Sequence, residues 1–225
     1  MLDMARRLVK WAPNICVKMP VTAAGLDVLE ECVAEGMTVC ATASFTVPQT
    51  LAIAERHMKG LERAVKAGIK PGRCFAVVMV GRLDDYLRDV AQDRGASVSE
   101  SDIIQSGTAV IKRAYQLFNQ RGYKAILMPA GMRGAYHVAS LAGAKMVMSI
   151  APKIATMAAG IAEPWRQQID EPVPADVIER LMTLPEFVRA YEPDGMKPHD
   201  FITYGVVQKT LSQFVEAGWG PMETY

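Results

Sequence analysis

The sequence has no excess of charge of either sign and no long hydrophobic run. Its 225 residues include 25 Lys and Arg against 24 Asp and Glu, which gives a formal net charge of +1. This balance provides no broad electrostatic surface for nucleic acid or for an acidic membrane. No apolar run approaches the roughly 18 residues that a membrane span needs, and no signal-peptide core follows the charged N-terminus. We therefore expect neither nucleic acid nor a membrane as a partner.

Common metal and nucleotide motifs are also missing. No C-x-x-C pair occurs, and the cysteines are not spaced with the three histidines as metal ligands would be. Neither G-x-G-x-x-G nor G-x-x-x-x-G-K-[ST] is present. The four cysteines are Cys16, Cys32, Cys40 and Cys74. Buried, reduced thiols are the favoured interpretation, which indicates a cytoplasmic protein without a metal site.

Half of the residues are hydrophobic and 22% are charged, which excludes disorder, collagen and coiled coil. Short apolar runs alternate with stretches of helical period. The runs cover residues 14–19, 38–43, 74–80, 124–128 and 145–150, and the helical stretches cover 22–35, 48–67, 101–121 and 133–142. Gly36 and Gly68 stand where the first two helices should end. The alternation predicts an α/β fold with parallel strands buried on both faces, either a doubly wound sheet or part of a (β/α)8 barrel.

The chain changes character at about residue 161. From there it consists of helical stretches separated by prolines, and it ends in an amphipathic helix over residues 201–217. The prolines are Pro164, Pro172, Pro174, Pro185, Pro193 and Pro198. We expect residues 161–225 to form a helical extension of the same domain as the βα units of residues 1–160.

Lys18 lies inside an apolar run, between Ile15 and Pro20. Burial among apolar residues would desolvate this amine and lower its pKa toward the neutral form. The neutral amine is the form that attacks a carbonyl to make a Schiff base. A lysine that reaches solvent at the strand end, or that pairs with a carboxylate, is the alternative that the residues leave open.

Polar residues follow the next three runs. Thr42 and Ser44 have the period-2 spacing that places them on one strand face, where a hydroxyl would hold a water for proton transfer. A structural threonine bonded to the backbone is the alternative. Arg82 and Arg133, each close to a glycine, follow two neighbouring strands and would clamp a phosphate, or would make only surface contacts.

Other ionisable residues are given structural positions. Asp84 and Asp85 are expected in the first turn of the helix after the third run, where acidic side chains are favoured. His57 and His137 fall at helix positions expected to face solvent, and His199 lies in a proline-rich loop. None of the three histidines is assigned a chemical role.

Taken in order, several motifs resemble the transaldolase family, including its fructose-6-phosphate aldolase-like branch. They are VKMPVTAAGL from Val17, EGM from Glu35, the stretch from Thr42 to Gln49, VGRLDD from Val80, AGMR from Ala130, LAGA from Leu141 and SIAP from Ser149. The resemblance covers roughly residues 14–155. Several motifs in the same order make it more specific than any one of them.

The resemblance implies a (β/α)8 TIM barrel, of which this chain would provide strands four to eight and lack the first two to three βα units. It implies that Lys18 forms the imine and that Thr42 positions the catalytic water. Arg82 and Arg133 would bind the phosphate of a sugar phosphate, and we place Ser44 among the substrate-binding residues. No cofactor is implied, because the lysine itself is the electron sink, and we expect a homo-oligomer.

The sequence also departs from the family's pattern. Cys40, Val77 and Gly131 stand where transaldolases have polar residues, and Met79 stands where the aldolase-like branch has a tyrosine. The family's strand-one aspartate and strand-three glutamate have no counterpart here. Three functions stay open: transfer of a three-carbon dihydroxyacetone unit between sugar phosphates, an aldolase-type lyase, and a truncated barrel that binds sugar phosphate without catalysis.

Overall fold

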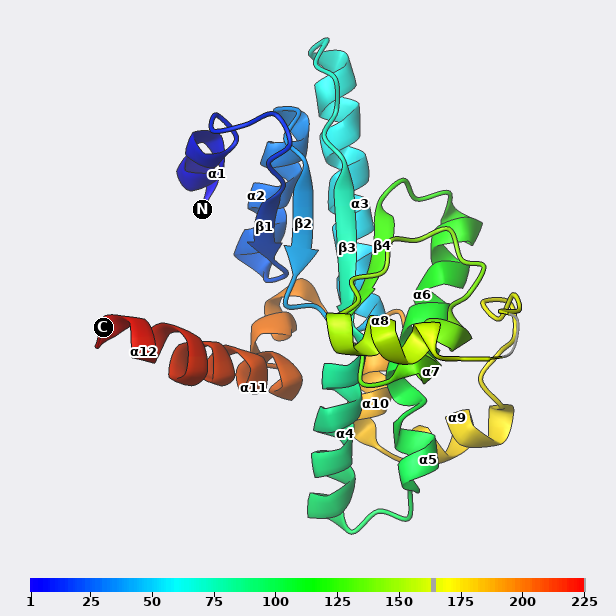
Figure 1. Cartoon of the computed structure of the whole chain (residues 1–225). Coiled ribbons are helices and arrows are strands. Elements are labelled where there is room, and N and C mark those ends of the chain that lie inside the picture. Colours follow the sequence, from blue (N-terminus) through cyan, green and yellow to red (C-terminus); the bar gives the residue numbers. More distant parts are fainter. Residues whose placement is uncertain (163–164, 225) are drawn as a thin grey trace.

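The fold is built on a parallel β-sheet. The computed structural model describes residues 1–162 and 165–224, so the predicted helix separator Pro164 lies outside the described residues. The strands are β1 (Val17–Pro20), β2 (Val39–Thr42), β3 (Cys74–Met79) and β4 (Ile126–Ala130). They are hydrogen-bonded in the order β1-β2-β3-β4, and every pair is parallel. In the described chain the sheet is open, with β1 and β4 at its edges (Figure 1).

The two faces of the sheet differ. Val17 and Met19 of β1 are buried in the core, whereas Lys18 between them is exposed. Strand β2 alternates in the same way between buried and half-buried residues. The prediction that these strands are buried on both faces is therefore wrong for β1 and β2. The helix that follows β1 packs against β1 and β2, and alternation sends every second side chain of these strands to the opposite face.

The first two long helices begin and end close to the predicted positions. Helix α2 (Ala23–Ala34) starts at Thr22, whose hydroxyl accepts a hydrogen bond from the backbone N–H of Gly25. Helix α3 (Val47–Lys66) is capped in the same way by Thr46. Gly36 and Gly68 follow these helices with φ of +83° and +69°, which confirms them as stop positions. The short helix α1 (Leu2–Leu8) precedes β1.

Helix α4 (Val80–Arg94) follows β3 without a loop, and the next predicted helix is divided. A one-turn helix α5 (Glu100–Ile103) precedes α6 (Ser106–Arg121), in place of a single helix over residues 101–121. Ser99 and Asp102 form a capping box at the start of α5. Because α4 begins at Val80, Asp84 and Asp85 lie in its second turn, and their predicted first-turn position is wrong.

The fifth apolar run does not form a strand. Residues 145–150 run beside β4. The N–H of Val147 donates to the carbonyl of Leu127, and the N–H of Ser149 donates to the carbonyl of Pro129. These two bonds are made in one direction only, so the segment is extended without a full ladder. Along the chain, α7 (Ala135–Ser140) connects β4 to this segment, and it is shorter than the helix predicted over residues 133–142.

The C-terminal part is helical, as the proline pattern predicts, but the single helix predicted over residues 201–217 is divided. Its elements are α8 (Pro152–Ala159), α9 (Ala175–Leu181), α10 (Pro185–Tyr191), a 3₁₀ helix (Pro198–Thr203), α11 (Gly205–Phe214), a π-helical turn (Val215–Trp219) and α12 (Gly220–Glu223). Tyr204 fixes α11 to the body: its buried ring meets Tyr86 of α4 edge to face, and its hydroxyl donates to the carbonyl of Glu186. This contact brings α11 back to α4 (Figure 1).

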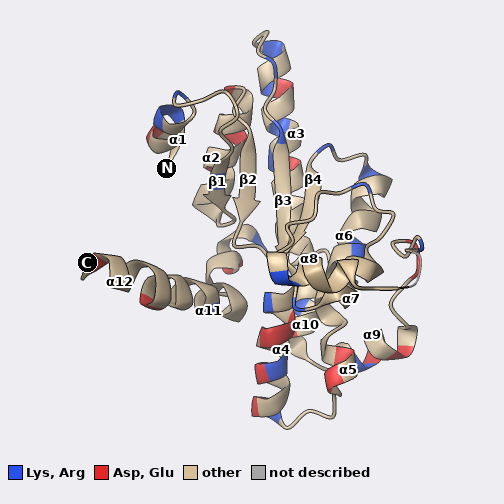
Figure 2. Cartoon of the chain, viewed as in Figure 1, with Lys and Arg blue, Asp and Glu red and all other residues tan. Residues whose placement is uncertain are grey.

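Charged residues are concentrated on the helices. Lys18 is the one charged residue in the four strands of the described chain, whereas α3 and α4 carry both signs along their length (Figure 2). Within residues 1–162 and 165–224, no helix combines the length and the apolar character needed to cross a membrane.

Candidate active site

Lys18 and Thr42 lie on one face of neighbouring strands. In the register of β1 and β2, Lys18 pairs with Cys40 and Pro20 pairs with Thr42. Paired residues of parallel strands point to the same side, so Lys18 and Thr42 share a face and are two positions apart. Thr42 is the last residue of β2, at the carboxyl end where barrel enzymes carry their chemistry. The structure therefore brings these two predicted catalytic residues to one region.

The predicted desolvation of Lys18 is wrong for this chain. Its side chain is exposed, because the apolar residues beside it in sequence point to the opposite face of the sheet. Cys40, which pairs with Lys18 across the strands, is half-buried. Burial raises the pKa of this thiol, although the positive charge of Lys18 acts to lower it. All four cysteines are free thiols, and Cys16 is exposed rather than buried as expected.

Ser44 has a structural contact. Its side chain is fully buried, and its hydroxyl donates a 2.5 Å hydrogen bond to the carbonyl of Val77 in β3. The backbone turns sharply just before it, since Ala43 adopts a left-handed φ of +55°. Ser44 does not line the cavity that contains Arg82 and Arg133. Its predicted place among the substrate-binding residues stays a prediction.

Gln49 organises the ends of β1 and β2. This fully buried amide accepts a hydrogen bond from the N–H of Phe45 and donates to the carbonyls of Ala43 and Val21. It thereby links the segments that follow Lys18 and Thr42. The sequence places Gln49 at the end of a family-like motif, but a buried amide of this kind has no local signal.

Arg82 and Arg133 line one cavity. Arg82 lies in the first turn of α4, directly after β3, and Arg133 lies in the loop after β4. The cavity has a volume of about 90 Å³ and is closed on its other side by α11. Its lining consists of Arg82, Asp85, Arg133, Val206, Lys209, Thr210 and Gln213. Three cations and one carboxylate give this small space a net positive charge, which favours an anionic ligand.

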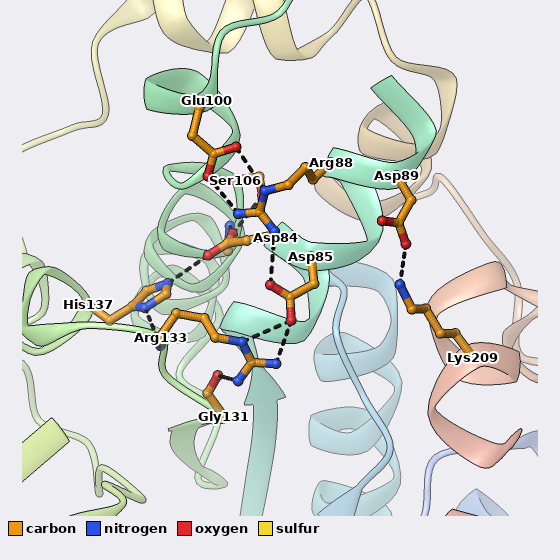
Figure 3. Close-up of polar contacts among 11 residues, drawn as sticks. Asp84, Asp85, Arg88, Asp89, Glu100, Ser106, Gly131, Arg133, His137 and Lys209 are labelled. Carbon is orange, nitrogen blue, oxygen red and sulfur yellow. Dashed lines mark hydrogen bonds and ion pairs between the residues drawn. The ribbon is translucent and has the colours of Figure 1, made fainter. Parts of the chain in front are cut away.

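The guanidinium of Arg133 is held in place by Asp85 (Figure 3). Nε and Nη2 donate to one carboxylate oxygen of Asp85, at 2.9 Å and 2.7 Å, and Nη1 donates to the carbonyl of Gly131 at 2.8 Å. Burial alone would raise the pKa of Asp85, but Arg133 and Arg88 outweigh it and hold that pKa below its ordinary value. Asp85 therefore stays ionised at neutral pH.

Arg82 is contacted by α11. It donates a hydrogen bond to the side-chain oxygen of Gln213, and its guanidinium lies 5.3 Å from the ring centre of Phe214. Burial and the positive charge of Arg133 lower the pKa of Arg82. The positive charges of the two arginines repel each other in this confined space, and a bound anion would offset that repulsion.

The histidines are placed differently from the prediction. His57 is 3% exposed and His137 is fully buried, so the expectation that both face solvent is wrong. Their partners come from distant segments: His57 lies against the carbonyl of Gly72, and His137 against Asp84 of α4. His199 is exposed beside Asp200.

Three further site residues were missed in the sequence: Asp85 as the partner of Arg133, and Lys209 and Gln213 from α11. The last two lie more than 120 residues from Arg82 along the chain, and no local pattern connects them. The described residues contain no group of three or more His, Cys, Asp or Glu side chains arranged to hold a metal ion.

Comparison with known proteins gives a consistent result. The chain is similar to a probable transaldolase of Dehalococcoides mccartyi, with 28% identity over 137 residues that cover 61% of this chain and 49% of that protein. It is 31% identical over 159 residues to probable transaldolase 2 of Listeria monocytogenes, covering 68% and 58% of the two chains. It is 31% identical over 146 residues to a probable transaldolase of Lactiplantibacillus plantarum, covering 64% and 52%.

The matches to these relatives are partial: the chain spans about half the length of the curated relatives it matches. A family model described as transaldolase/fructose-6-phosphate aldolase, in contrast, matches residues 1–198, which include all four strands and both arginines of the cavity. With 198 of its 225 residues matched, the chain belongs to the transaldolase/fructose-6-phosphate aldolase family.

Proposed function

We propose that this chain carries the lysine and the phosphate-binding residues of a transaldolase-type site, which transfers a three-carbon dihydroxyacetone unit between sugar phosphates. The observation that supports this most directly is the cationic cavity of Arg82, Arg133 and Lys209. It lies beyond the carboxyl ends of β3 and β4, the same end of the sheet at which Thr42 terminates β2. Ligands of parallel α/β folds bind at this end.

In the proposed reaction, the neutral amine of Lys18 attacks the keto carbon of a ketose phosphate. Loss of water leaves an iminium, which accepts the electron pair of the C3–C4 bond as that bond breaks. The C4 hydroxyl gives up its proton to water held near Thr42, and the phosphorylated aldehyde leaves. The enamine that remains attacks an acceptor aldehyde, whose carbonyl oxygen takes that proton back. Water near Thr42 then hydrolyses the new imine, which releases the product and the free amine of Lys18.

The cationic residues of the cavity would bind the phosphate end of both substrates. Guanidinium groups bind phosphate through paired hydrogen bonds, and the Lys209 ammonium adds a point charge. Fixing the phosphate at one end of the sheet would orient the carbonyl toward the strands that carry Lys18 and Thr42. We assign β1 to β4 and the extended segment 145–150 to strands four to eight of a (β/α)8 barrel. The face that carries Lys18 would then be the barrel interior.

Borohydride trapping tests this function. The chain is incubated with fructose 6-phosphate and borohydride, and its intact mass and peptide map are recorded. We expect a three-carbon adduct on Lys18. Lys18→Met should abolish the adduct, whereas Lys70→Met, which removes another exposed lysine, should leave it unchanged. An adduct that persists in Lys18→Met contradicts the assignment.

The exposure of Lys18 supports a second candidate function, a family member that binds sugar phosphate without catalysis. Attack on a carbonyl needs a lone pair on the amine nitrogen, and desolvation, which favours that neutral form, is absent at an exposed side chain. An unmodified chain that still binds fructose 6-phosphate would favour this function. If an adduct forms, the need for an acceptor aldehyde in product formation separates transfer from the lyase reaction.

A further inference from the structure

Asp84 and His137 form a fully buried pair that the proposed chemistry does not use. The Nε2 atom of His137 lies 3.0 Å from one carboxylate oxygen of Asp84, and both side chains are 0% exposed (Figure 3). Within the described residues, neither of these two atoms makes a hydrogen bond, so this ion-pair contact is the one polar contact of each. Neither residue lines the cavity of Arg82 and Arg133, so neither would touch a bound anion.

The second ring nitrogen of His137 connects this pair to the site. Nδ1 lies 3.2 Å from the backbone nitrogen of Arg133 and accepts its N–H. A nitrogen that accepts a hydrogen bond carries no hydrogen, so the neutral ring carries its hydrogen on Nε2, where it faces Asp84. The carboxylate therefore selects the tautomer that holds the main chain of Arg133.

Asp84 is itself fixed from the other side. Its second oxygen accepts hydrogen bonds of 2.8 Å from the hydroxyl of Ser106 and from the backbone N–H of Gly107, at the start of α6. A buried carboxylate needs such donors, and the N-terminus of a helix supplies them. The orientation of the His137 ring is thus determined by α4 and α6 together.

Consecutive residues of α4 therefore hold one arginine in two ways: Asp85 bonds the guanidinium of Arg133, and Asp84 acts on its backbone through His137. The loop also packs tightly on α4. A Cβ added at Gly81 would lie 2.4 Å from the carbonyl oxygen of Gly131 and 2.6 Å from Cγ of Arg133.

From this geometry we infer that Asp84 and His137 are positioning residues, which fix the backbone of Arg133 so that its side chain faces the cavity. The inference rests on the proposed function for the identity of the anion, a sugar phosphate. The positioning itself concerns only the conformation of the chain and is measured without a ligand.

The test is Asp84→Asn in the full chain. The amide oxygen still accepts from Ser106 and Gly107, but the amide nitrogen now donates to Nε2 of His137. The hydrogen moves to Nδ1, where it opposes the N–H of Arg133. We expect nitrogen NMR to report the Nε2–H tautomer in the unaltered chain and the Nδ1–H tautomer in the variant. The Arg133 amide should exchange faster, and affinity for inorganic phosphate and fructose 6-phosphate should fall about tenfold.

Ser106→Ala is the matched control. It removes one donor to Asp84 but keeps the carboxylate that faces His137, so tautomer, Arg133 exchange and affinity should stay within about twofold. Unchanged exchange at Arg133 in folded Asp84→Asn overturns the inference. Failure of the unaltered chain to bind either phosphate compound overturns the proposed function alone, because the exchange measurement reads the positioning directly.

Two substitutions of His137 keep the inference testable if Asp84→Asn does not fold. In His137→Asn the amide oxygen takes the place of Nδ1 and still accepts the Arg133 N–H, so protection of that amide should persist. In His137→Gln the longer amide reaches the place of Nε2 only, and protection should be lost. Equal protection of Arg133 in the two variants contradicts the inference.

Discussion

Asp85 and Arg133, 48 positions apart, are joined by two hydrogen bonds that converge on a single carboxylate oxygen. Asp85 belongs to α4, which follows β3, and Arg133 belongs to the loop after β4. The contact therefore connects the segments that follow two neighbouring strands at the carboxyl end of the sheet. Because Nη1 is also bound, to Gly131, the orientation of this guanidinium is set before any ligand arrives. Preorganised charges of this kind lower the cost of binding an anion.

Replacement of Arg133 should weaken sugar-phosphate binding. Hydrogen bonds to charged groups contribute about 1.5–3 kcal/mol, so Arg133→Gln should reduce the affinity for fructose 6-phosphate by about ten- to a hundredfold. Arg88→Gln is the control, because Arg88 bonds the other oxygen of Asp85 but does not line the cavity. Titration calorimetry should show the loss in the first variant and not in the second; equal losses would mean that Asp85, not Arg133, controls binding.

Lys209 should contribute a smaller, salt-dependent part of the affinity. It lines the cavity from α11 and pairs with Asp89, and its side chain is 41% exposed, so solvent screens its charge. Exposed charge pairs contribute about 0.2–1 kcal/mol, so Lys209→Ala should reduce affinity about two- to fivefold at low salt and less at high salt. Lys66→Ala, in the last turn of α3, should have no effect. A loss that does not depend on salt would contradict the electrostatic role.

Local sequence patterns were sufficient for most of the fold. Gly36 and Gly68 mark helix ends because a left-handed backbone there requires glycine, and this requirement is visible in the sequence. Residues 145–150 are apolar enough for a strand, but a strand also needs a ladder in which both its N–H and its carbonyl groups bond a neighbouring strand. At the edge next to β4 only two bonds form, and composition carries no information about that.

The site was predictable only in part, for a similar reason. Arg82 and Arg133 are recognisable because each follows a strand, and parallel strands bring their carboxyl ends together. His137 gains its partners from α4 and from the loop before it, and the burial that results depends on how α4, α6 and α7 pack. Asp84 and His137 lie on different helices, 53 positions apart in the sequence. The periodicity of one helix cannot predict a contact of this kind.

Gly81 should be intolerant of a side chain. In Gly81→Ala the new Cβ would overlap Gly131 and Arg133, so the loop that carries the arginine must move. We expect a loss of about 1–3 kcal/mol in the free energy of unfolding, typical of overpacking, together with weaker phosphate binding. In Gly218→Ala no atom lies within 4 Å of the new Cβ, and stability should change by no more than about 1 kcal/mol. Urea denaturation of both variants makes the comparison; equal stabilities would contradict the close packing at Gly81.

His57 should make the stability of the chain fall as the pH is lowered. Its ring is buried in α3 against the carbonyl of Gly72, and burial lowers its pKa in the folded chain. The unfolded chain regains the ordinary pKa of about 6.5 and therefore binds a proton that the folded chain does not. The stabilising difference is complete above pH 6.5 and is lost as the pH falls toward the folded-state pKa, by at most about 1.36 kcal/mol per pH unit.

Urea denaturation at pH 7.5 and pH 5.0 measures this dependence, in a range above the titration of the ordinary carboxylates. In His57→Gln the side-chain amide still donates to Gly72 but does not titrate, so the difference in unfolding free energy between the two pH values should shrink. His199→Gln removes an exposed histidine and should retain the full difference, since it leaves the buried ring of His57 in place. A difference that is unaltered in His57→Gln would mean that other groups cause the loss at low pH.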